Sequence, residues 1–230
     1  MTQPVLELKN VSKTYPTTPP VHAVQNVDMI VESGELLAVV GPSGSGKSTM
    51  LHIMGTLDRP TSGEVTVAGH EVSTMSDAKL SGLRSAHIGF VFQAFHLLTG
   101  YSALDNVADG LLYTGMSLDD RRARAYEALV TVGLGNRLDH VATQLSGGEG
   151  QRVAIARAIV GDHSLVLADE PTGNLDTQTS EDIVELLHHL NGAGTTIVVV
   201  THDLEIAESL PRIVRLRDGR IESDRTKEPA

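Results

Sequence analysis

The sequence predicts an α/β protein built on a parallel β-sheet, and two observations support this. First, three short apolar runs have the composition of strands that are buried on both faces, and they span residues 36–40, 165–168 and 197–200. Second, each run is followed at once by residues that can bind or react: a glycine-rich loop from Gly41, the pair Asp169 and Glu170, and Thr201 with His202. Because ligands bind beyond the carboxyl ends of strands in an open parallel sheet, we expect these separated segments to meet at one site.

Composition excludes several classes of protein. The chain has 230 residues and a net charge of -11, which argues against a broad nucleic-acid-binding surface. It has no cysteine, so disulfide frameworks and thiolate metal sites are excluded. The apolar runs are far shorter than the roughly 18 residues of a membrane span. The first residues show no secretory signal, and we therefore expect a cytosolic protein.

Strands are also predicted near the N-terminus. Residues 5–9 alternate between apolar and polar, as in a half-buried strand. Residues 24–31 and 64–68 have similar patterns, and the second of these segments follows a turn at residues 60–63. We expect short antiparallel strands beside the first strand of the core.

The middle of the chain is predicted to be helical. Residues 117–120 have the form of a helix start, and Gly133 ends the pattern. The predicted apolar face consists of Ala123, Tyr126, Leu129 and Val130. Residues 95–160 contain no convincing strand run, so we expect them to form a helical subdomain that is inserted into the α/β core.

A later helix begins near Thr177 and ends at residues 191–192, with Ile183, Leu186, Leu187 and Leu190 at core-facing spacing. The predicted organisation has four parts. Residues 1–94 form an N-terminal β subdomain and the first part of the core, and residues 95–160 form the helical insertion. Residues 161–221 form the second part of the core, and residues 222–230 form a frayed polar tail.

The glycine-rich loop fits the phosphate-binding pattern G-x-x-x-x-G-K-[ST], and it lies between a predicted strand and a predicted helix. Its glycines allow backbone N–H groups to converge on phosphate oxygens. Lys47 should reach the β- and γ-phosphates, and the Ser48 hydroxyl should ligate Mg²⁺. The pattern predicts a P-loop NTPase core. The expected nucleotide-binding residues of the loop are Gly41, Ser43, Gly44, Ser45, Gly46, Lys47, Ser48 and Thr49.

A second glycine motif, L-S-G-G-E-G-Q-R, occupies residues 145–152 before a helical segment. Alone, it would be an ordinary N-cap and turn. Other motifs accompany it in order: the phosphate loop, Gln93 after F-V-F, the acidic pair, N-L-D at residues 174–176, and His202. With these motifs, the chain from about residue 5 to residue 220 resembles the nucleotide-binding subunits of ABC transporters. The resemblance implies the ABC ATPase fold, with a RecA-like parallel sheet, and ATP and Mg²⁺ as cofactors.

The same resemblance implies a homodimer. In that family two subunits pair head to tail, and each ATP lies between the phosphate loop of one subunit and the L-S-G-G motif of the other. The residues that would act across the dimer are Ser146, Gly147, Gly148 and Asp176. Gly150 departs from the family pattern, since many relatives carry Gln there.

The resemblance also assigns roles in ATP hydrolysis. Glu170 would polarise the attacking water, and Lys47 and His202 would contact the phosphates or hold the water in line. Asp169 would bind Mg²⁺ through water, and Ser48 and Gln93 would ligate the ion. Taken alone, His202 could be a neighbour of a helix N-cap and Gln93 a surface amide.

Two aromatic features complete the expected site. Tyr15 resembles the ring that stacks on adenine in this family, and the alternative is a tyrosine packed in the N-terminal sheet. Phe90, Phe92 and Phe95 surround Gln93. These rings could be plain core, yet in transporter ATPases this segment joins a groove for the membrane subunit, so we expect permease contacts at residues 95–101.

Within the superfamily, the motifs around Gln93 and Glu170 are similar to those of the LolD/MacB-type branch. The similarity implies an ATPase on the cytoplasmic face of the membrane that drives a permease in export, lipoprotein extraction or mechanotransmission. It also implies that this chain contacts neither the transported substrate nor nucleic acid. The alternative is a soluble ABC-type ATPase that acts on nucleic acid or the ribosome. The absence of heptad repeats between the phosphate loop and L-S-G-G disfavours the coiled-coil members of that class.

Overall fold

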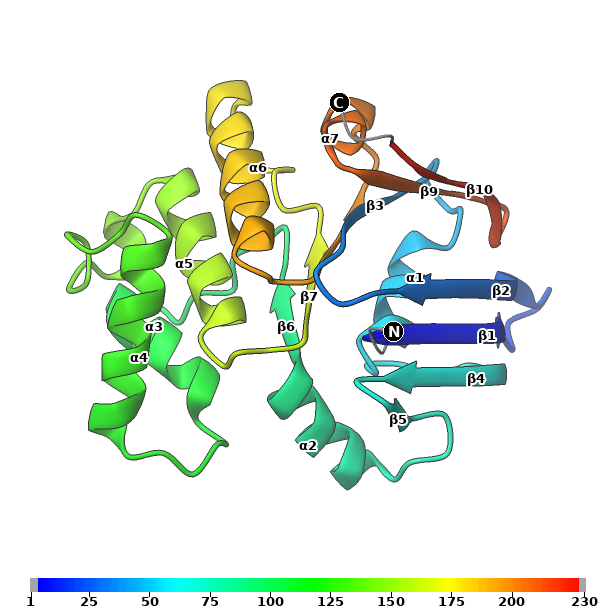
Figure 1. Cartoon of the computed structure of the whole chain (residues 1–230), viewed down its shortest axis with the longest axis horizontal. Helices are drawn as coiled ribbons and strands as arrows, with labels where there is room; N and C mark the ends of the chain where they lie inside the picture. Colours follow the sequence, from blue (N-terminus) through cyan, green and yellow to red (C-terminus); the bar gives the residue numbers. More distant parts are fainter. Residues whose placement is uncertain (1–3, 228–230) are drawn as a thin grey trace.

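The structure is a computed structural model that describes residues 4–227. It contains a six-stranded sheet in the order β10-β9-β3-β8-β7-β6 and a four-stranded sheet in the order β2-β1-β4-β5 (Figure 1). Helices α3, α4 and α5 lie together on one side of the six-stranded sheet, and the four-stranded sheet lies on the other (Figure 1). The predicted α/β fold with a parallel core and an N-terminal antiparallel sheet is confirmed.

The six-stranded sheet contains the three predicted buried runs. They are the strands β3 (Leu36–Val40), β7 (Leu165–Asp169) and β8 (Ile197–Thr201). Their neighbours are β6 (Ile88–Val91), β9 (Arg212–Arg217) and β10 (Arg220–Thr226). All adjacent pairs are parallel except β9 with β10. Val40 is paired with Thr201 and Asp169 with Val200, so the three carboxyl ends lie side by side.

The four-stranded sheet is antiparallel, as predicted, although its first two strands are longer than expected. Its strands are β1 (Leu6–Tyr15), β2 (Val21–Val31), β4 (Ser62–Val67) and β5 (His70–Glu71). Side chains of a strand alternate between its two faces. Leu37 and Val39 of β3 therefore pack toward this sheet and helix α1 (Lys47–Met54), whereas Ala38 and Val40 pack toward the helices on the other face.

Residues 95–160 contain no strand, apart from an isolated bridge between Ser102 and Val141. The helices in this segment are α3 (Ala103–Ala108), η1 (Asp109–Leu111), α4 (Leu118–Thr131), η2 (Ala142–Gln144) and α5 (Gly147–Ile159). Outside it lie α2 (Asp77–His87), α6 (Thr177–Gly192) and α7 (Leu204–Ser209). The helical character of the segment agrees with the sequence analysis, and the four-part division of the chain stays a prediction.

One predicted helix face is wrong. In α4, Ala123, Tyr126 and Val130 are exposed, and of the predicted face only Leu129 is buried. The buried residues of this helix are Ala125, Ala128 and Leu129. The prediction favoured large apolar side chains, but small alanines face the core here, where α4 packs against α3 and α5. In α6, by contrast, all four predicted core residues are buried.

The predicted frayed tail is also wrong for the residues that the structure describes. Residues 222–226 belong to β10, which pairs with β9. Ion pairs of Arg212 with Asp224 (2.7 Å) and of Arg217 with Glu222 (3.2 Å) link the two strands. A charged edge strand has no apolar alternation, which explains why the sequence pattern missed it. Residues 228–230 lie outside the described residues.

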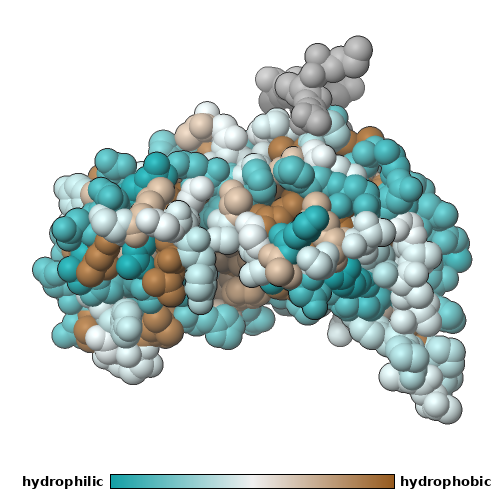
Figure 2. Space-filling model, turned by 90° about the horizontal axis from the view of Figure 1, so that it is seen from below, coloured by the Kyte–Doolittle hydropathy of each residue, from teal (hydrophilic) through white to brown (hydrophobic). Residues whose placement is uncertain are grey.

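The face that is seen from the side of α2 is mostly hydrophilic, with apolar patches over the helices at the left (Figure 2). Among the described residues, no helix combines the length and the apolar composition that crossing a bilayer requires.

The close approach of α5 to β6 gives a test of the fold. A Cβ added to Gly89 would lie 2.0 Å from the carbonyl oxygen of Ala158. We expect Gly89→Ala to lower the free energy of unfolding by about 1–3 kcal/mol, because the strand and helix must separate. In the control Gly82→Ala, on the open surface of α2, we expect a gain of up to about 1 kcal/mol. Denaturant unfolding measures both, and a Gly89→Ala protein as stable as the wild type would contradict this packing.

Candidate active site

The carboxyl ends of β3, β7 and β8 border a cavity of about 600 Å³. The cavity brings together most of the predicted nucleotide-binding and catalytic residues. Those that line it are Tyr15, Ser43, Gly44, Gly46, Lys47, Ser48, Thr49, Gln93, Asp169, Glu170 and His202. Gly41 and Ser45 do not line it: a Cβ on Gly41 would lie 2.2 Å from the Leu216 carbonyl oxygen, and Ser45 is buried. Val21, His22 and Ala23 of β2 also contribute, which the sequence analysis missed.

The phosphate loop joins β3 to α1 and needs its glycines for two reasons. Gly44 and Gly46 have φ values of 79° and 100°, in the left-handed region that favours glycine. A Cβ on Gly46 would also lie 2.1 Å from the carbonyl oxygen of Ala23. The ammonium group of Lys47 donates to the carbonyl oxygens of Gly41 (2.7 Å) and Pro42 (3.0 Å), which keeps it at the mouth of the loop.

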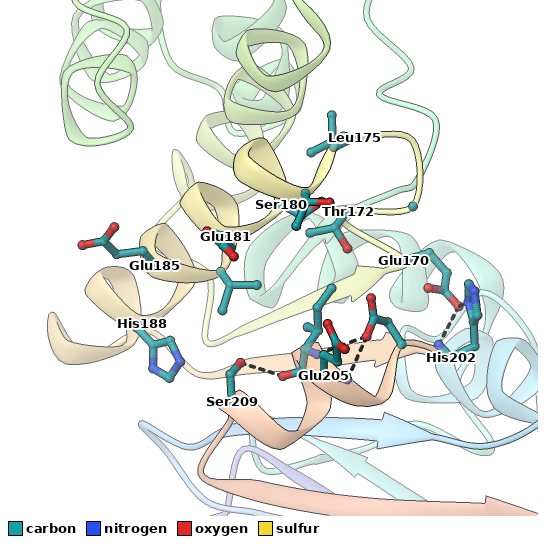
Figure 3. Close-up of a pocket in the computed structure, with 15 residues that line it drawn as sticks. Glu170, Thr172, Leu175, Ser180, Glu181, Glu185, His188, His202, Glu205 and Ser209 are labelled. Atoms are coloured by element: carbon teal, nitrogen blue, oxygen red, sulfur yellow. Dashed lines mark hydrogen bonds and ion pairs between the residues drawn. The ribbon is translucent and has the colours of Figure 1, made fainter.

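Glu170 follows β7 in a left-handed conformation, with φ of 45°. Its N–H donates to the carbonyl oxygen of Val200 on the neighbouring strand (2.8 Å). Its carboxylate accepts from the Thr201 hydroxyl at 2.8 Å. It also accepts from the N–H of His202 (2.9 Å) and from His202 Nδ1 (2.7 Å), two residues whose contact is drawn in Figure 3. Three donors from the end of β8 thus fix this carboxylate, while the His202 side chain remains 72% exposed.

Asp169, the last residue of β7, has chemistry that suits a bound cation. Burial raises its pKa, the negative charge of Glu170 raises it further, and His52 and Lys47 partly offset both effects. A divalent cation would relieve the repulsion between the two carboxylates. Ser48 and Gln93 line the same cavity and offer the oxygen ligands that Mg²⁺ prefers.

Gln93 is linked to the segment that follows Glu170. Its amide group donates to Asn174 Oδ1 (3.3 Å), and Asn174 Nδ2 donates to the Gln93 carbonyl oxygen (2.9 Å). A Cβ on Gly173 would lie 2.7 Å from Gln93 Nε2, so a larger residue there would displace the Gln93 amide group. The sequence analysis assigned no role to Asn174 or Thr201, although both stand within or beside its motifs.

The L-S-G-G motif begins helix α5. The Ser146 hydroxyl accepts from the N–H of Glu149 (3.2 Å), and Glu149 accepts from the N–H of Ser146 (2.9 Å), which forms a capping box. The hydrogen bond from Arg137 (2.8 Å) lowers the pKa of Glu149 to about 2. Ser146 and Gly147 are exposed, and they line a separate cavity of about 350 Å³ beside Phe95. They are not brought into the nucleotide cavity of their own chain.

Close packing ties α5 to the segment that follows Gln93. Gly150 is buried, and a Cβ there would lie 2.9 Å from the ring of Phe95. Arg157 donates to the carbonyl oxygens of Phe95 and His96, both at 2.8 Å. The departure from the family pattern at Gly150 therefore leaves room for the Phe95 ring.

Asp176 also lies apart from the nucleotide cavity. It is the N-cap of α6, where its carboxylate accepts from the N–H (3.0 Å) and the hydroxyl (2.7 Å) of Thr179.

Beyond Glu170 and His202, a groove of about 900 Å³ runs between α6 and α7 (Figure 3). The sequence analysis did not predict this groove.

Comparison with known proteins agrees with this geometry. The family model described as "ABC transporter" matches residues 24–173. An "Uncharacterized ABC transporter ATP-binding protein" of Thermotoga maritima is 52% identical over 95% of this chain and 94% of its own. "Macrolide export ATP-binding/permease protein MacB 1" of Aeromonas hydrophila subsp. hydrophila is 46% identical over the whole of this chain. The chain spans only 36% of that longer relative.

Solved structures show the same fold. The ATP-binding cassette MJ0796, in a dimeric post-hydrolysis state bound to ADP and Pi, has a TM-score of 0.87. It is 43% identical over 98% of this chain and 100% of its own. The cassette cbiO1 from Clostridium perfringens, described as part of the ABC transporter complex cbiONQ, has the same TM-score at 28% identity and covers 97% of this chain and 88% of its own. The chain belongs to the ABC transporter family, as an ATP-binding cassette that hydrolyses ATP.

Proposed function

We propose that two copies of this chain pair head to tail, hydrolyse two ATP molecules in their shared seam and thereby drive a membrane permease. One observation carries the proposal: Ser146 and Gly147 are exposed at a helix start outside the nucleotide cavity. Each cavity thus lacks this anion-binding motif until a second copy supplies it. A two-fold pair completes both sites at once. The dimeric structures of the similar cassette MJ0796 support the proposal.

In this proposal the phosphate loop holds the triphosphate, and Lys47 contacts the β- and γ-phosphates. Tyr15, which lines the same cavity, stacks on the base. Ser146, Gly147, Gly148 and Asp176 act from the other subunit. The backbone N–H groups at the start of α5 then face the γ-phosphate, where the partial positive charge of the helix stabilises the anion.

Ser48, Gln93 and Asp169 would hold Mg²⁺, with Asp169 acting through water. The ion neutralises phosphate charge when it is bound. Glu170 orients the attacking water, and His202 holds Glu170 and contacts the γ-phosphate. The three hydrogen bonds to the Glu170 carboxylate keep it in place without movement during the reaction.

The role of Glu170 can be tested by Glu170→Gln. The amide keeps the size of the side chain but removes the negative charge that orients the water, so we expect ATP turnover to fall by at least a hundredfold. We expect the variant still to bind ATP, as measured by calorimetry. Glu127→Gln on the exposed face of α4 is the matched control and should hydrolyse ATP normally. Full turnover by Glu170→Gln would refute the assignment.

The role of Ser146 can be separated from its structural role as an N-cap. Ser117 caps α4 with the same geometry, since its hydroxyl accepts from the N–H of Asp120 at 3.2 Å. We expect Ser146→Ala and Ser117→Ala to lower the free energy of unfolding equally, by about 1 kcal/mol. Only Ser146→Ala should slow ATP turnover, by about tenfold or more. Equal turnover in the two variants would show that Ser146 is a helix cap alone.

The permease contact is proposed for residues 95–101. Leu98 and Tyr101 are about half exposed. Their loop is fixed from beneath by buried Asn106, whose side chain accepts from the Leu98 N–H (2.7 Å) and donates to the Tyr101 carbonyl oxygen (3.2 Å). A rigid apolar loop needs little ordering when a partner binds. Similar proteins whose names join "ATP-binding" and "permease" support such a partner.

This contact would place the chain on the cytoplasmic face of a membrane, where the permease handles the substrate and this chain does not touch it. Export or extraction of the MacB type is the transport that the relatives favour. The alternative, a soluble ATPase that acts on nucleic acid or the ribosome, is not favoured by any of these relatives.

Leu98→Glu tests the contact, because a charge on the loop should prevent docking to an apolar partner. We expect a tagged wild-type chain to copurify with an integral membrane protein from detergent-solubilised membranes of its source, and Leu98→Glu to lose at least nine-tenths of that protein. Tyr126→Glu is the control, because Tyr126 of α4 is about as exposed as Leu98, and this variant should retain the membrane protein. ATP binding should be unchanged in both variants. Undiminished copurification with Leu98→Glu would exclude this surface.

A further inference from the structure

The ring of Tyr15 is held by a carboxylate that the sequence analysis did not consider. The Tyr15 hydroxyl donates to Asp58 Oδ2 at 2.9 Å. The other oxygen of Asp58 accepts from Lys13 Nζ (2.6 Å) and from the N–H of Arg59 (2.7 Å). Lys13 also donates to the Arg59 carbonyl oxygen at 2.7 Å. Both oxygens of Asp58 are therefore occupied, and its position is fixed from two sides.

Lys13 and Tyr15 are two residues apart on β1 and share one face of the strand. The Lys13 ammonium lies 5.0 Å from the centroid of the Tyr15 ring, within the range of a cation–π interaction. The cation lies over one face of the ring, and Tyr15 also lines the nucleotide cavity. Burial opposes the charge on Asp58, but the hydrogen bonds from Lys13 and Tyr15 outweigh it and keep the pKa of Asp58 below its ordinary value. The carboxylate is thus charged at neutral pH.

Asp58 is also connected to the phosphate loop through α1. At the end of this helix, the N–H groups of Leu57 and Asp58 donate to the His52 carbonyl oxygen, at 2.8 and 3.1 Å. The same helix begins at Lys47, at the end of the phosphate loop. One helix therefore carries the phosphate-binding loop at its start and, just beyond its end, the carboxylate that holds the ring.

We propose that Asp58, which is paired with Lys13, is a positioning residue that orders the Tyr15 ring before the nucleotide base binds. The inference rests on the proposed stacking role of Tyr15. A ring that is already ordered loses less conformational entropy when the base binds. Without Asp58 the ring must be ordered during binding, so we expect ATP affinity to fall by about three- to tenfold.

The experiment compares two ligands by calorimetry: ATP, and inorganic tripolyphosphate, which has the phosphates but no base. We expect Asp58→Ala, Tyr15→Phe and Tyr15→Ala to weaken ATP binding and to leave tripolyphosphate binding unchanged. Adding Asp58→Ala to Tyr15→Ala should cause no further loss, because both changes remove the same contribution. The matched control is Asp28→Ala, whose carboxylate accepts from the Asn10 N–H in the same sheet, and it should bind ATP normally.

The possible results are distinguishable. Equal losses of ATP and tripolyphosphate binding in Asp58→Ala would mean a general structural role and overturn the proposal. Normal ATP binding by Asp58→Ala, with weak binding by Tyr15→Ala, would also overturn it but would leave base stacking intact. Normal ATP binding by Tyr15→Ala would overturn both the positioning role of Asp58 and the stacking role of Tyr15 on which it rests. The role proposed for Glu170 in hydrolysis would still stand.

Discussion

The alignment of three parallel strands is the constraint on which the rest of the site depends. The pairing of Val40 with Thr201 and of Asp169 with Val200 places three carboxyl ends at one edge of the sheet. The phosphate loop, the acidic pair and His202 follow these ends directly. A shift of register by one residue would turn the buried side chains to the wrong face, so the two apolar cores that lock the register also lock the site.

The site combines rigid parts with one part that is incomplete. Glu170 is held by three donors from the end of β8, and α1 joins the phosphate loop to the support of Tyr15. The exposed start of α5 lies outside the cavity of its own chain, and Arg157 ties this helix to the segment after Gln93. In the proposed dimer, closure would bring two preformed halves together, and Gln93, which lines the cavity, would link the nucleotide to the helices.

The sequence predicted β3, β7 and β8 of the core sheet, the phosphate loop and α6 because each has a strong local pattern, whereas β6 and β9 were not predicted. The prediction of the buried face of α4 was wrong because alanines carry little hydrophobic signal. The strand β10 was missed because a charged edge strand has no alternation of apolar and polar residues. The residues that hold Gln93 and Tyr15 in place were missed for a different reason. Asn174 meets Gln93, and Asp58 meets Tyr15, across long stretches of sequence, and only the folded register brings such pairs into contact.

The central claim is that two chains close around two nucleotides. Sedimentation velocity of Glu170→Gln, with and without saturating Mg²⁺-ATP, tests it most directly, because this substitution should trap the closed form. We expect a monomer without ATP and a dimer with ATP, with two nucleotides bound per dimer. A protein that binds the nucleotide but stays monomeric at saturating Mg²⁺-ATP would contradict the claim.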